Sequence, residues 1–323
     1  MKTVSLAILA ATGLAFTSGP GGAQPAYPSR PITMVVPLPA GGTADLLCRL
    51  AAEKAAAVLK QQIVVENRPV GAGGRVAIEG VIRGAPDGHT VLCAPQLSFT
   101  VAHLLFTKSP LDTRSLEPVS VLATYPLILI ARGNFPADDF PGFLAHAKAN
   151  PGKVNYGHQG KGNTGHLLGE LLMLKGEFRM TEIPYRGSAP AINDLLGGNI
   201  DLVPDYLLAN KQNIDTGKLK FLATGSRERI KNYPKVATIA ETLPGVYADT
   251  WMAVAMPPKT PKEIVQTLSD AINAGFKADD LRKRILALEA EPLGSSPDEM
   301  RKLIDASLQH WSPVIGAAKI TIE

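Results

Sequence analysis

The sequence predicts an α/β protein with two lobes, each organised around its own sheet. Strand and helix signals alternate along most of the 323 residues, as they do in folds with parallel sheets. Two segments, at residues 35–45 and 154–166, share the order strand, glycine-rich loop, helix start. The chain also exceeds the size that one core usually organises, so we expect two domains.

The first 23 residues have the three parts of a secretory signal peptide. Lys2 gives a positive start, residues 4–16 form an apolar run, and the small residues 21–23 offer a cleavage site before Gln24. The apolar run is shorter than the roughly 20 residues that span a bilayer, so an uncleaved anchor is the less favoured alternative. We expect residues 1–23 to be removed and the mature protein to lie outside the cytoplasm.

Charge argues against a nucleic-acid partner. The whole chain carries a formal net charge of +4, and removal of the first 23 residues takes away only Lys2. The charges are mixed along the sequence, and no basic stripe with interleaved aromatic residues is present. We therefore expect no nucleic-acid binding.

The N-terminal part of the chain has the pattern of a βαβαβ unit. Residues 32–36 are nearly all apolar, as in a buried parallel strand. Apolar residues then recur on one face at helical spacing. The expected elements are a strand at 32–36, a helix at about 44–60, a strand at 63–65, a helix opened by the glycine turn 71–74, and a strand at 90–93.

A similar unit follows Tyr125 and Pro126, and the chain then becomes helical to its end. Pro190 favours a helix start and Gly197 a helix end. Thr260 and Ser296 each begin a capping box with proline at the first helical position. The expected strands are at 127–131, 154–156, 200–203, 220–224 and 250–256, with a helix carrying residues 167–175.

The chain has two cysteines, Cys48 and Cys93. Cys48 lies on the apolar face of the first expected helix and Cys93 in an expected strand, where a small buried hydrophobic residue is the favoured interpretation. A disulfide is the alternative, since an oxidising compartment permits one and the sequence does not determine its geometry. The six histidines show no metal-ligand spacing, so we expect no metal site.

Seven sequence blocks, in order and together, resemble the Bug family, the TctC-like substrate-binding proteins of tripartite tricarboxylate transporters. The resemblance extends from about Tyr27 to the C-terminus. The blocks are YPSRPI at 27–32, PLPAGGTAD at 37–45, VENRP at 65–69 with the glycine cluster after it, APDG at 85–88, ANPGK at 149–153, PYRGSAPA at 184–191, and DLLGG at 194–198.

The resemblance implies a type II periplasmic binding protein fold with a ligand cleft between two lobes. Lobe one is then discontinuous, residues 24–124 plus 250–323, and lobe two is residues 125–249, with crossings near 119–125 and 248–252. The implied function is that of a periplasmic receptor that captures a small carboxylate and delivers it to the membrane subunits of the transporter. We expect a monomer without cofactor or catalytic residues.

The family's ligand-binding positions carry over to the two glycine loops and to one acidic residue. In this family, backbone groups and ordered waters of the two loops grip the ligand carboxylate. The candidate ligand-binding residues are Pro39, Ala40, Gly41, Gly42, Thr43, Asp45, His158, Gln159, Gly160, Lys161, Gly162, Asn163, Thr164, His166 and Asp205.

Elementary chemistry suits several of these residues to an anion. Helix-start N–H groups and the positive end of the helix dipole favour negative charge. Gly41 and Gly42 let the main chain approach an oxygen closely, at φ values that other residues resist. Thr43 and Thr164 either cap their helices or bind the ligand. Asp45 either holds loop amides or accepts from a water or an ammonium group.

Asp205 permits the same two roles as Asp45, and it could also select ligands with an amino or hydroxyl group. The second loop departs from the family pattern, because His158, Gln159 and Lys161 stand where serine and small residues are usual. Lys161 either points to solvent or turns inward to pair with a second carboxylate of the ligand.

The sequence leaves two other function classes as alternatives. A secreted hydrolase is disfavoured, because the sequence has no G-x-S-x-G elbow, and residues 157–162 fit neither G-x-G-x-x-G nor a P-loop. His158 and His166 near Asp205 could mimic an acid–base pair, but no nucleophile accompanies them. A receptor that reports to a membrane sensor instead of a transporter remains the alternative to transport.

Overall fold

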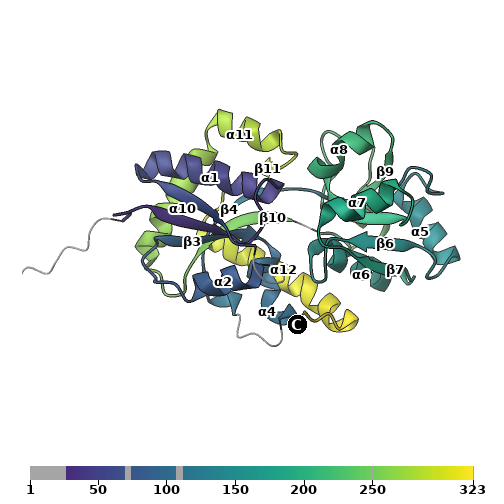
Figure 1. Cartoon of the computed structure of the whole chain (residues 1–323), viewed down its shortest axis with the longest axis horizontal. Coiled ribbons are helices and arrows are strands. Elements are labelled where there is room, and N and C mark those ends of the chain that lie inside the picture. Colours follow the sequence, from purple (N-terminus) through teal and green to yellow (C-terminus); the bar gives the residue numbers. More distant parts are fainter. Residues whose placement is uncertain (1–26, 70–73, 107–111, 249, 323) are drawn as a thin grey trace, which may run out of the picture.

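The computed structural model describes residues 27–69, 74–106, 112–248 and 250–322, and it confirms the predicted two-lobed α/β fold (Figure 1). The predicted signal peptide and most of the glycine turn at 71–74 lie outside the described residues. No helix in the described part of the chain is long and apolar enough to cross a membrane.

The first lobe contains a six-stranded sheet in the order β11-β4-β10-β3-β1-β2. Strands β1, β2 and β3 are parallel, and β10 runs antiparallel to its neighbours β3 and β4. The strands are β1 (Ile32–Val36), β2 (Ile63–Asn67), β3 (Thr90–Pro95), β4 (Glu117–Thr124), β10 (Trp251–Met256) and β11 (Glu291–Pro292).

Helices cover both faces of this sheet. On one face, Leu47 of α1 and Leu268 of α10 pack with Met34 and Val254. On the other, buried residues of α2, α3 and α12 pack with those of the sheet. The helical segments of this lobe are α1 (Thr43–Leu59), α2 (Arg75–Ile82), α3 (Leu97–Thr100), α4 (Ala102–Leu105), the 3-10 turn η2 (Thr113–Ser115), α10 (Lys262–Phe276) and α11 (Asp279–Leu286).

The second lobe contains a five-stranded sheet in the order β7-β6-β8-β5-β9. Strand β5 is antiparallel to β8 and β9, whereas β6 is parallel to β7 and β8. The elements are β5 (Leu127–Arg132), α5 (Phe140–Ala149), β6 (Asn155–His158), α6 (Thr164–Gly176), β7 (Thr181–Pro184), α7 (Ser188–Leu196), β8 (Leu202–Tyr206), α8 (Leu207–Asp215), β9 (Leu219–Thr224) and α9 (Ile239–Thr242).

Two segments connect the lobes. Strand β4 ends at Thr124 and β5 begins at Leu127, so the first connection is Tyr125 and Pro126. The second reaches β10 (Trp251–Met256) from the second lobe, and Tyr125 N donates to Thr250 O where the two connections approach each other (3.1 Å). Residues 117–124, part of which was expected as a crossing, pair with β10 as a strand of the first sheet.

The last helix, α12 (Pro297–Ala318), belongs to the packing of both lobes. Met300, near its start, is buried with core residues of the first sheet. Trp311 and Ile315, further along, are buried in the core that contains Leu129 and Leu167 of the second lobe. Figure 1 shows this helix running from beneath the first lobe toward the second. The domain boundaries given above remain a prediction.

One of the two predicted capping boxes is present. Ser296 accepts from Glu299 N, and Glu299 reaches back to the Ser296 N–H, as predicted. The prediction at Thr260 was wrong: α10 has Pro261 at its N-cap, and the Thr260 hydroxyl donates to Pro257 O instead. A capping box that was not predicted starts α9, where Thr238 and Glu241 bond reciprocally.

The two cysteines form a disulfide, which corrects the favoured prediction of unpaired side chains. Cys48 lies on the face of α1 that packs on the first sheet, and Cys93 lies on the face of β3 that α1 covers. Their Cα atoms are 6.1 Å apart, within the range that a disulfide needs. The apolar stripe that indicated burial is therefore also what places the two sulfur atoms together.

Candidate functional site

The first glycine loop is held in place by a buried carboxylate. Asp45, in the first turn of α1, is 2% exposed. Its Oδ2 accepts from the Gly41 N–H (2.9 Å) and from Nε of Arg49 (2.9 Å), and its Oδ1 accepts from Nδ2 of Asn67 (2.9 Å). Burial alone would raise the pKa of Asp45, but these donors outweigh it and hold the pKa below its usual value. Asp45 therefore has the predicted role of holding a loop amide.

The start of α1 presents backbone N–H groups that no side chain caps. Gly42 is the N-cap residue, without a side-chain hydrogen bond, and residues 39–42 are exposed. The first N–H groups of a helix have no partner within the helix. Gly41 has a φ of +91°, which favours glycine, but Gly42 has a φ of −78°. The expectation of an unusual φ at Gly42 was wrong, and a Cβ at Gly42 would meet open space.

Neither predicted threonine caps its helix. Thr43 and Thr164 are each the first helical residue, and the N-cap residues are Gly42 and Asn163. The Asn163 side chain accepts from the His166 N–H (2.8 Å). Thr164 is buried and Thr43 is half-buried. The capping alternative is thereby removed for both.

In the second glycine loop, two buried imidazoles bind the backbone. Gly160 N–H donates to Nδ1 of His158 (3.1 Å), and Gly162 N–H donates to Nδ1 of His166 (3.1 Å). Both glycines have positive φ, +131° and +75°. The two side chains are at most 3% exposed. Sequence reasoning placed them in a pocket, whereas the structure places them behind the loop.

Asp205 is the centre of a second buried network behind the same loop. Its Oδ1 accepts from Nε2 of Gln159 (2.9 Å), and its Oδ2 accepts from the Ser188 hydroxyl and from Nδ2 of Asn210 (3.0 Å). Asp205 is fully buried. Burial raises its pKa, against the effect of these donors. Of its two predicted roles, this geometry favours the supporting one.

Gln159 joins the Asp205 network to the helix start. Its Oε1 accepts from Nδ2 of Asn163 (3.1 Å), the residue that caps α6, and its Nε2 also donates to Pro204 O (2.7 Å). The side chain of Lys161, by contrast, is exposed at the tip of the loop. The inward arrangement, in which Lys161 pairs with a second carboxylate of the ligand, stays a prediction.

The two loops belong to different lobes. The first follows β1 and the second follows β6, and each of these strands is parallel to its neighbours in its own sheet. No hydrogen bond between described residues joins one loop to the other. Contacts between the lobes are nevertheless close by. The rings of Tyr125 and Tyr206 are 5.1 Å apart, and a Cβ at Gly162 would meet side chains of Leu105 and Ile322.

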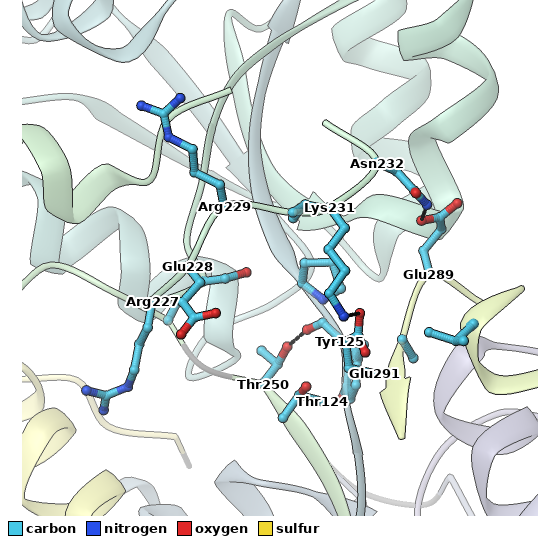
Figure 2. A pocket seen from close by; sticks show the side chains of 16 residues that line it. Thr124, Tyr125, Arg227, Glu228, Arg229, Lys231, Asn232, Thr250, Glu289 and Glu291 are labelled. Carbon is cyan, nitrogen blue, oxygen red and sulfur yellow. Dashed lines mark hydrogen bonds and ion pairs between the residues drawn. The ribbon is translucent and has the colours of Figure 1, made fainter. Parts of the chain in front are cut away.

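A cavity of about 660 Å³ lies beside the crossings (Figure 2). The order of strands places it on the other side of the crossings from the glycine loops. The glycine loops follow β1 and β6, whereas the cavity is lined by residues next to β9 and β11. In the first sheet β1 and β11 lie on opposite sides of β4 and β10. In the second sheet β6 and β9 lie on opposite sides of β5. The cavity is lined by crossing residues, by the segment after β9, and by residues before and within β11.

Polar contacts join the lobes at this cavity. Lys231 Nζ lies 3.0 Å from Glu291 Oε1, and Asn232 Nδ2 lies 3.1 Å from Glu289 Oε2. Figure 2 shows both contacts between the segment after β9 and the residues around β11. None of the predicted ligand-binding residues lines this cavity.

Sequence reasoning missed five residues that hold the loops: Arg49, Asn67, Glu182, Ser188 and Asn210. Asn67 and Ser188 fall within the blocks that resemble the Bug family, so the blocks already marked them. Arg49, Glu182 and Asn210 lie outside these blocks, so no such signal marked them in the sequence. Glu182, on β7, contacts both buried imidazoles.

Comparison with known proteins identifies the family. The profile of the tripartite tricarboxylate transporter family receptor, TctC, matches residues 47–320. The protein BugT of Bordetella pertussis is 34% identical over 292 residues, which are 90% of this chain and 89% of BugT. These matches cover nearly all of the chain that follows the predicted signal peptide.

Solved structures show the same fold. Rpa4515 of R. palustris, solved with adipate, is 31% identical with a TM-score of 0.82, over 92% of this chain and 100% of that one. MatC of Rhodopseudomonas palustris, solved with bound malate, is 30% identical with a TM-score of 0.78, over 90% of this chain and 100% of that one. The chain belongs to the TctC family of tripartite tricarboxylate transporter receptors, periplasmic binding proteins that include the Bug proteins.

Proposed function

We propose that this receptor captures a small carboxylate between its lobes and delivers it to the membrane subunits of a tripartite tricarboxylate transporter. The observation that carries the proposal is the start of α1, where backbone N–H groups without a side-chain cap follow an exposed loop fixed by Asp45. A carboxylate there would accept hydrogen bonds from the backbone and gain from the helix dipole.

The second loop would supply the opposing wall of the site. The N–H groups of Gly160 and Gly162 are already bonded to imidazoles. We therefore assign the ligand contacts of this loop to its remaining backbone and to exposed polar groups. Its rigidity comes from the His158, His166 and Asp205 networks. Adipate and malate bound to the two related structures support a carboxylate as the ligand class.

The proposed function is binding without chemistry, in the periplasm, after removal of residues 1–23. Ligand contacts to both lobes exist only in a closed state, so the ligand shifts a hinge equilibrium. Osmotic-shock fractionation with N-terminal sequencing of the released protein tests the location, and a mature start at Gln24 is the expected result.

Thermal-shift measurements followed by titration calorimetry test the ligand class. The panel contains mono-, di- and tricarboxylates, with adipate and malate among them, and amines of matched size as controls. A ligand at 100 times its dissociation constant adds about 2.7 kcal/mol to the free energy of unfolding. Stabilisation by carboxylates but not by amines is expected, and stabilisation by amines alone would contradict the proposal.

Delivery to the transporter needs a separate test. In cells that take up the best carboxylate of the panel through the transporter, deletion of the receptor gene should abolish uptake, and the intact gene should restore it. Unchanged uptake, combined with tight binding in vitro, would favour the sensor alternative.

A further inference from the structure

Glu182 contacts both imidazoles that bind the second glycine loop. Its Oε1 lies 2.8 Å from Nε2 of His158 and 3.3 Å from Nε2 of His166. The rings of the two histidines are 4.6 Å apart. Glu182 comes from β7 and the two histidines from β6 and α6, so three elements meet at one carboxylate oxygen.

The hydrogen bonds around the rings determine where the protons lie. Each Nδ1 accepts from a backbone N–H, of Gly160 or of Gly162, and so carries no proton. In the neutral imidazole the proton is then on Nε2, which donates to Glu182. The carboxylate thus selects the tautomer that the loop requires.

We propose that Glu182 is a positioning residue for the ligand: it keeps His158 and His166 in the Nε2–H form, so that their Nδ1 atoms fix Gly160 and Gly162. The inference rests on the proposed function, because the loop that Glu182 positions is one wall of the proposed carboxylate site. Glu182 itself touches only the two imidazoles in this chain of contacts.

The same three side chains could suggest a metal site, since their ligand atoms lie within 4.8 Å of one another. A metal on both Nε2 atoms requires the protons to move to Nδ1. Each Nδ1–H would then point at a backbone N–H, of Gly160 or of Gly162, so that two hydrogen-bond donors would face each other. The arrangement of the loop therefore favours a proton-holding role over a metal-holding one.

Protonation of either ring would oppose the same hydrogen bonds, because an imidazolium carries a proton on both nitrogens. The charged and titratable groups around the rings are Glu182 on β7, Glu170 on α6, Tyr156 on β6, Lys161 in the loop and Arg179 before β7. Burial, the neighbouring His158 and Lys161 lower the pKa of His166 to about 4, against the effect of Glu182. The His166 ring can therefore stay neutral while the loop is in use.

The first test needs no ligand. Long-range ¹H–¹⁵N spectra of the mature protein at pH 7 should show the Nε2–H tautomer for His158 and His166. In Glu182→Met, which removes the acceptor at similar length, hydrogen exchange of the Gly160 and Gly162 amides should rise about tenfold, the factor that one ordinary hydrogen bond represents. Glu182→Gln, which keeps one acceptor oxygen, should show a smaller rise.

Two controls and the ligand affinity complete the test. Glu177→Gln removes an exposed charge at the end of α6 and should leave exchange and tautomers unchanged. Zn²⁺ alone should not shift the histidine signals. Affinity for adipate or malate, whichever binds, should fall about tenfold in Glu182→Met and stay constant in Glu177→Gln.

The Nδ1–H tautomer, zinc binding at both rings, or unchanged exchange in Glu182→Met would overturn the proposal. If the wild type binds no carboxylate, the proposed function fails, while the tautomer and exchange measurements still decide the role of Glu182. If carboxylates bind equally to wild type and Glu182→Met although exchange rises, Glu182 supports the loop without positioning the ligand, which also contradicts the proposal.

Discussion

At the scale of single residues, buried polar groups hold the two glycine loops of the proposed site in place. Asp45, His158, His166 and Asp205 were predicted as ligand-binding residues, and the structure places each of them behind a loop. The family pattern marked Asp45, His166 and Asp205 in the sequence, and His158 was marked as a departure from it. Their orientation could not be predicted, because it depends on partners from other elements, such as Glu182 for the histidines.

The depressed pKa of His166 gives the first prediction. Its folded-state pKa is about 4, below the 6.5 of an exposed histidine, mainly because burial disfavours the charged ring. The stability that this neutral ring contributes is complete above pH 6.5. As the pH falls from 6.5 through 4, the free energy of unfolding therefore decreases by roughly 3 kcal/mol.

Urea unfolding of wild type and His166→Gln between pH 4 and 8 measures this loss. The free energy of unfolding of the wild type should fall more steeply below pH 6.5 than that of the variant. Identical pH dependence for the two proteins would show that the ring does not stay neutral in the fold.

The exposed glycines of the first loop give a second prediction. Gly42→Val places a side chain in open space at an ordinary φ, next to the proposed carboxylate position. Affinity for the best carboxylate should fall by roughly 100-fold or more, since about 3 kcal/mol of backbone hydrogen bonding to a charged group is blocked. The melting temperature should change little.

Gly41→Ala is the matched comparison for Gly42→Val. Its φ of +91° strains any side chain, so this variant should lose roughly 1 kcal/mol of stability. Calorimetry and thermal melts of the two variants separate the roles. Full carboxylate affinity in Gly42→Val would remove the first loop from the binding site.

At the scale of elements, alternation of strand and helix signals predicted most of the fold. The strands at 32–36 and 127–131 agree with the observed β1 and β5 within one residue at each end, because continuous apolar runs mark buried strands. Strand β4 was missed as an element of the first sheet, although six of its eight residues are buried. The short edge strand β7 was missed because its residues are partly or largely exposed.

The Cys48–Cys93 disulfide gives a third prediction. It joins α1 to β3 across a sequence separation of 45 residues. The bond keeps a loop of that length closed in the unfolded chain, which adds up to about 4 kcal/mol to the free energy of unfolding. The double variant Cys48→Ala, Cys93→Ala should therefore unfold at clearly lower urea concentration than the oxidised protein.

The oxidised wild type, the dithiothreitol-reduced wild type and the double variant should be compared by urea unfolding. Reduction should destabilise the wild type and leave the variant unchanged. Equal stability of the oxidised and reduced wild type would contradict a stabilising role for the bond.

At the scale of the whole molecule, the order of strands places two kinds of inter-lobe surface on opposite sides of the crossings. The glycine loops lie on one side, and the contacts of Lys231 and Asn232 with Glu291 and Glu289 lie on the other. The sequence could indicate two lobes through the repeated glycine loops. It could not indicate the second surface, because its residues become neighbours only when β11 pairs with β4.

Closure around the crossings should separate this second surface while it brings the loops together. Glu289 is the least exposed carboxylate there, at 10%, and it contacts Asn232 and Lys211. Glu289→Gln should destabilise the arrangement of lobes in this structure, relative to the closed state, by up to about 1 kcal/mol. Carboxylate affinity should therefore rise by as much as about fivefold. Calorimetry with the best carboxylate measures the change.

Glu53→Gln is the control for this prediction. Glu53 pairs with Arg284 within the first lobe, so its loss should not bias closure. Weaker binding in Glu289→Gln, or an equal gain in both variants, would show that the contacts behind the crossings do not oppose closure.

The central claim is that one carboxylate is held by both glycine loops at once. An ¹H–¹⁵N NMR titration of the deuterated mature protein with adipate and with malate tests it most directly. For whichever acid binds, we predict that amides of residues 41–45 and of residues 159–165 shift together, with a single dissociation constant. Saturable shifts confined to one loop, or to residues around the cavity behind the crossings such as Thr124 and Ser226, would contradict the claim.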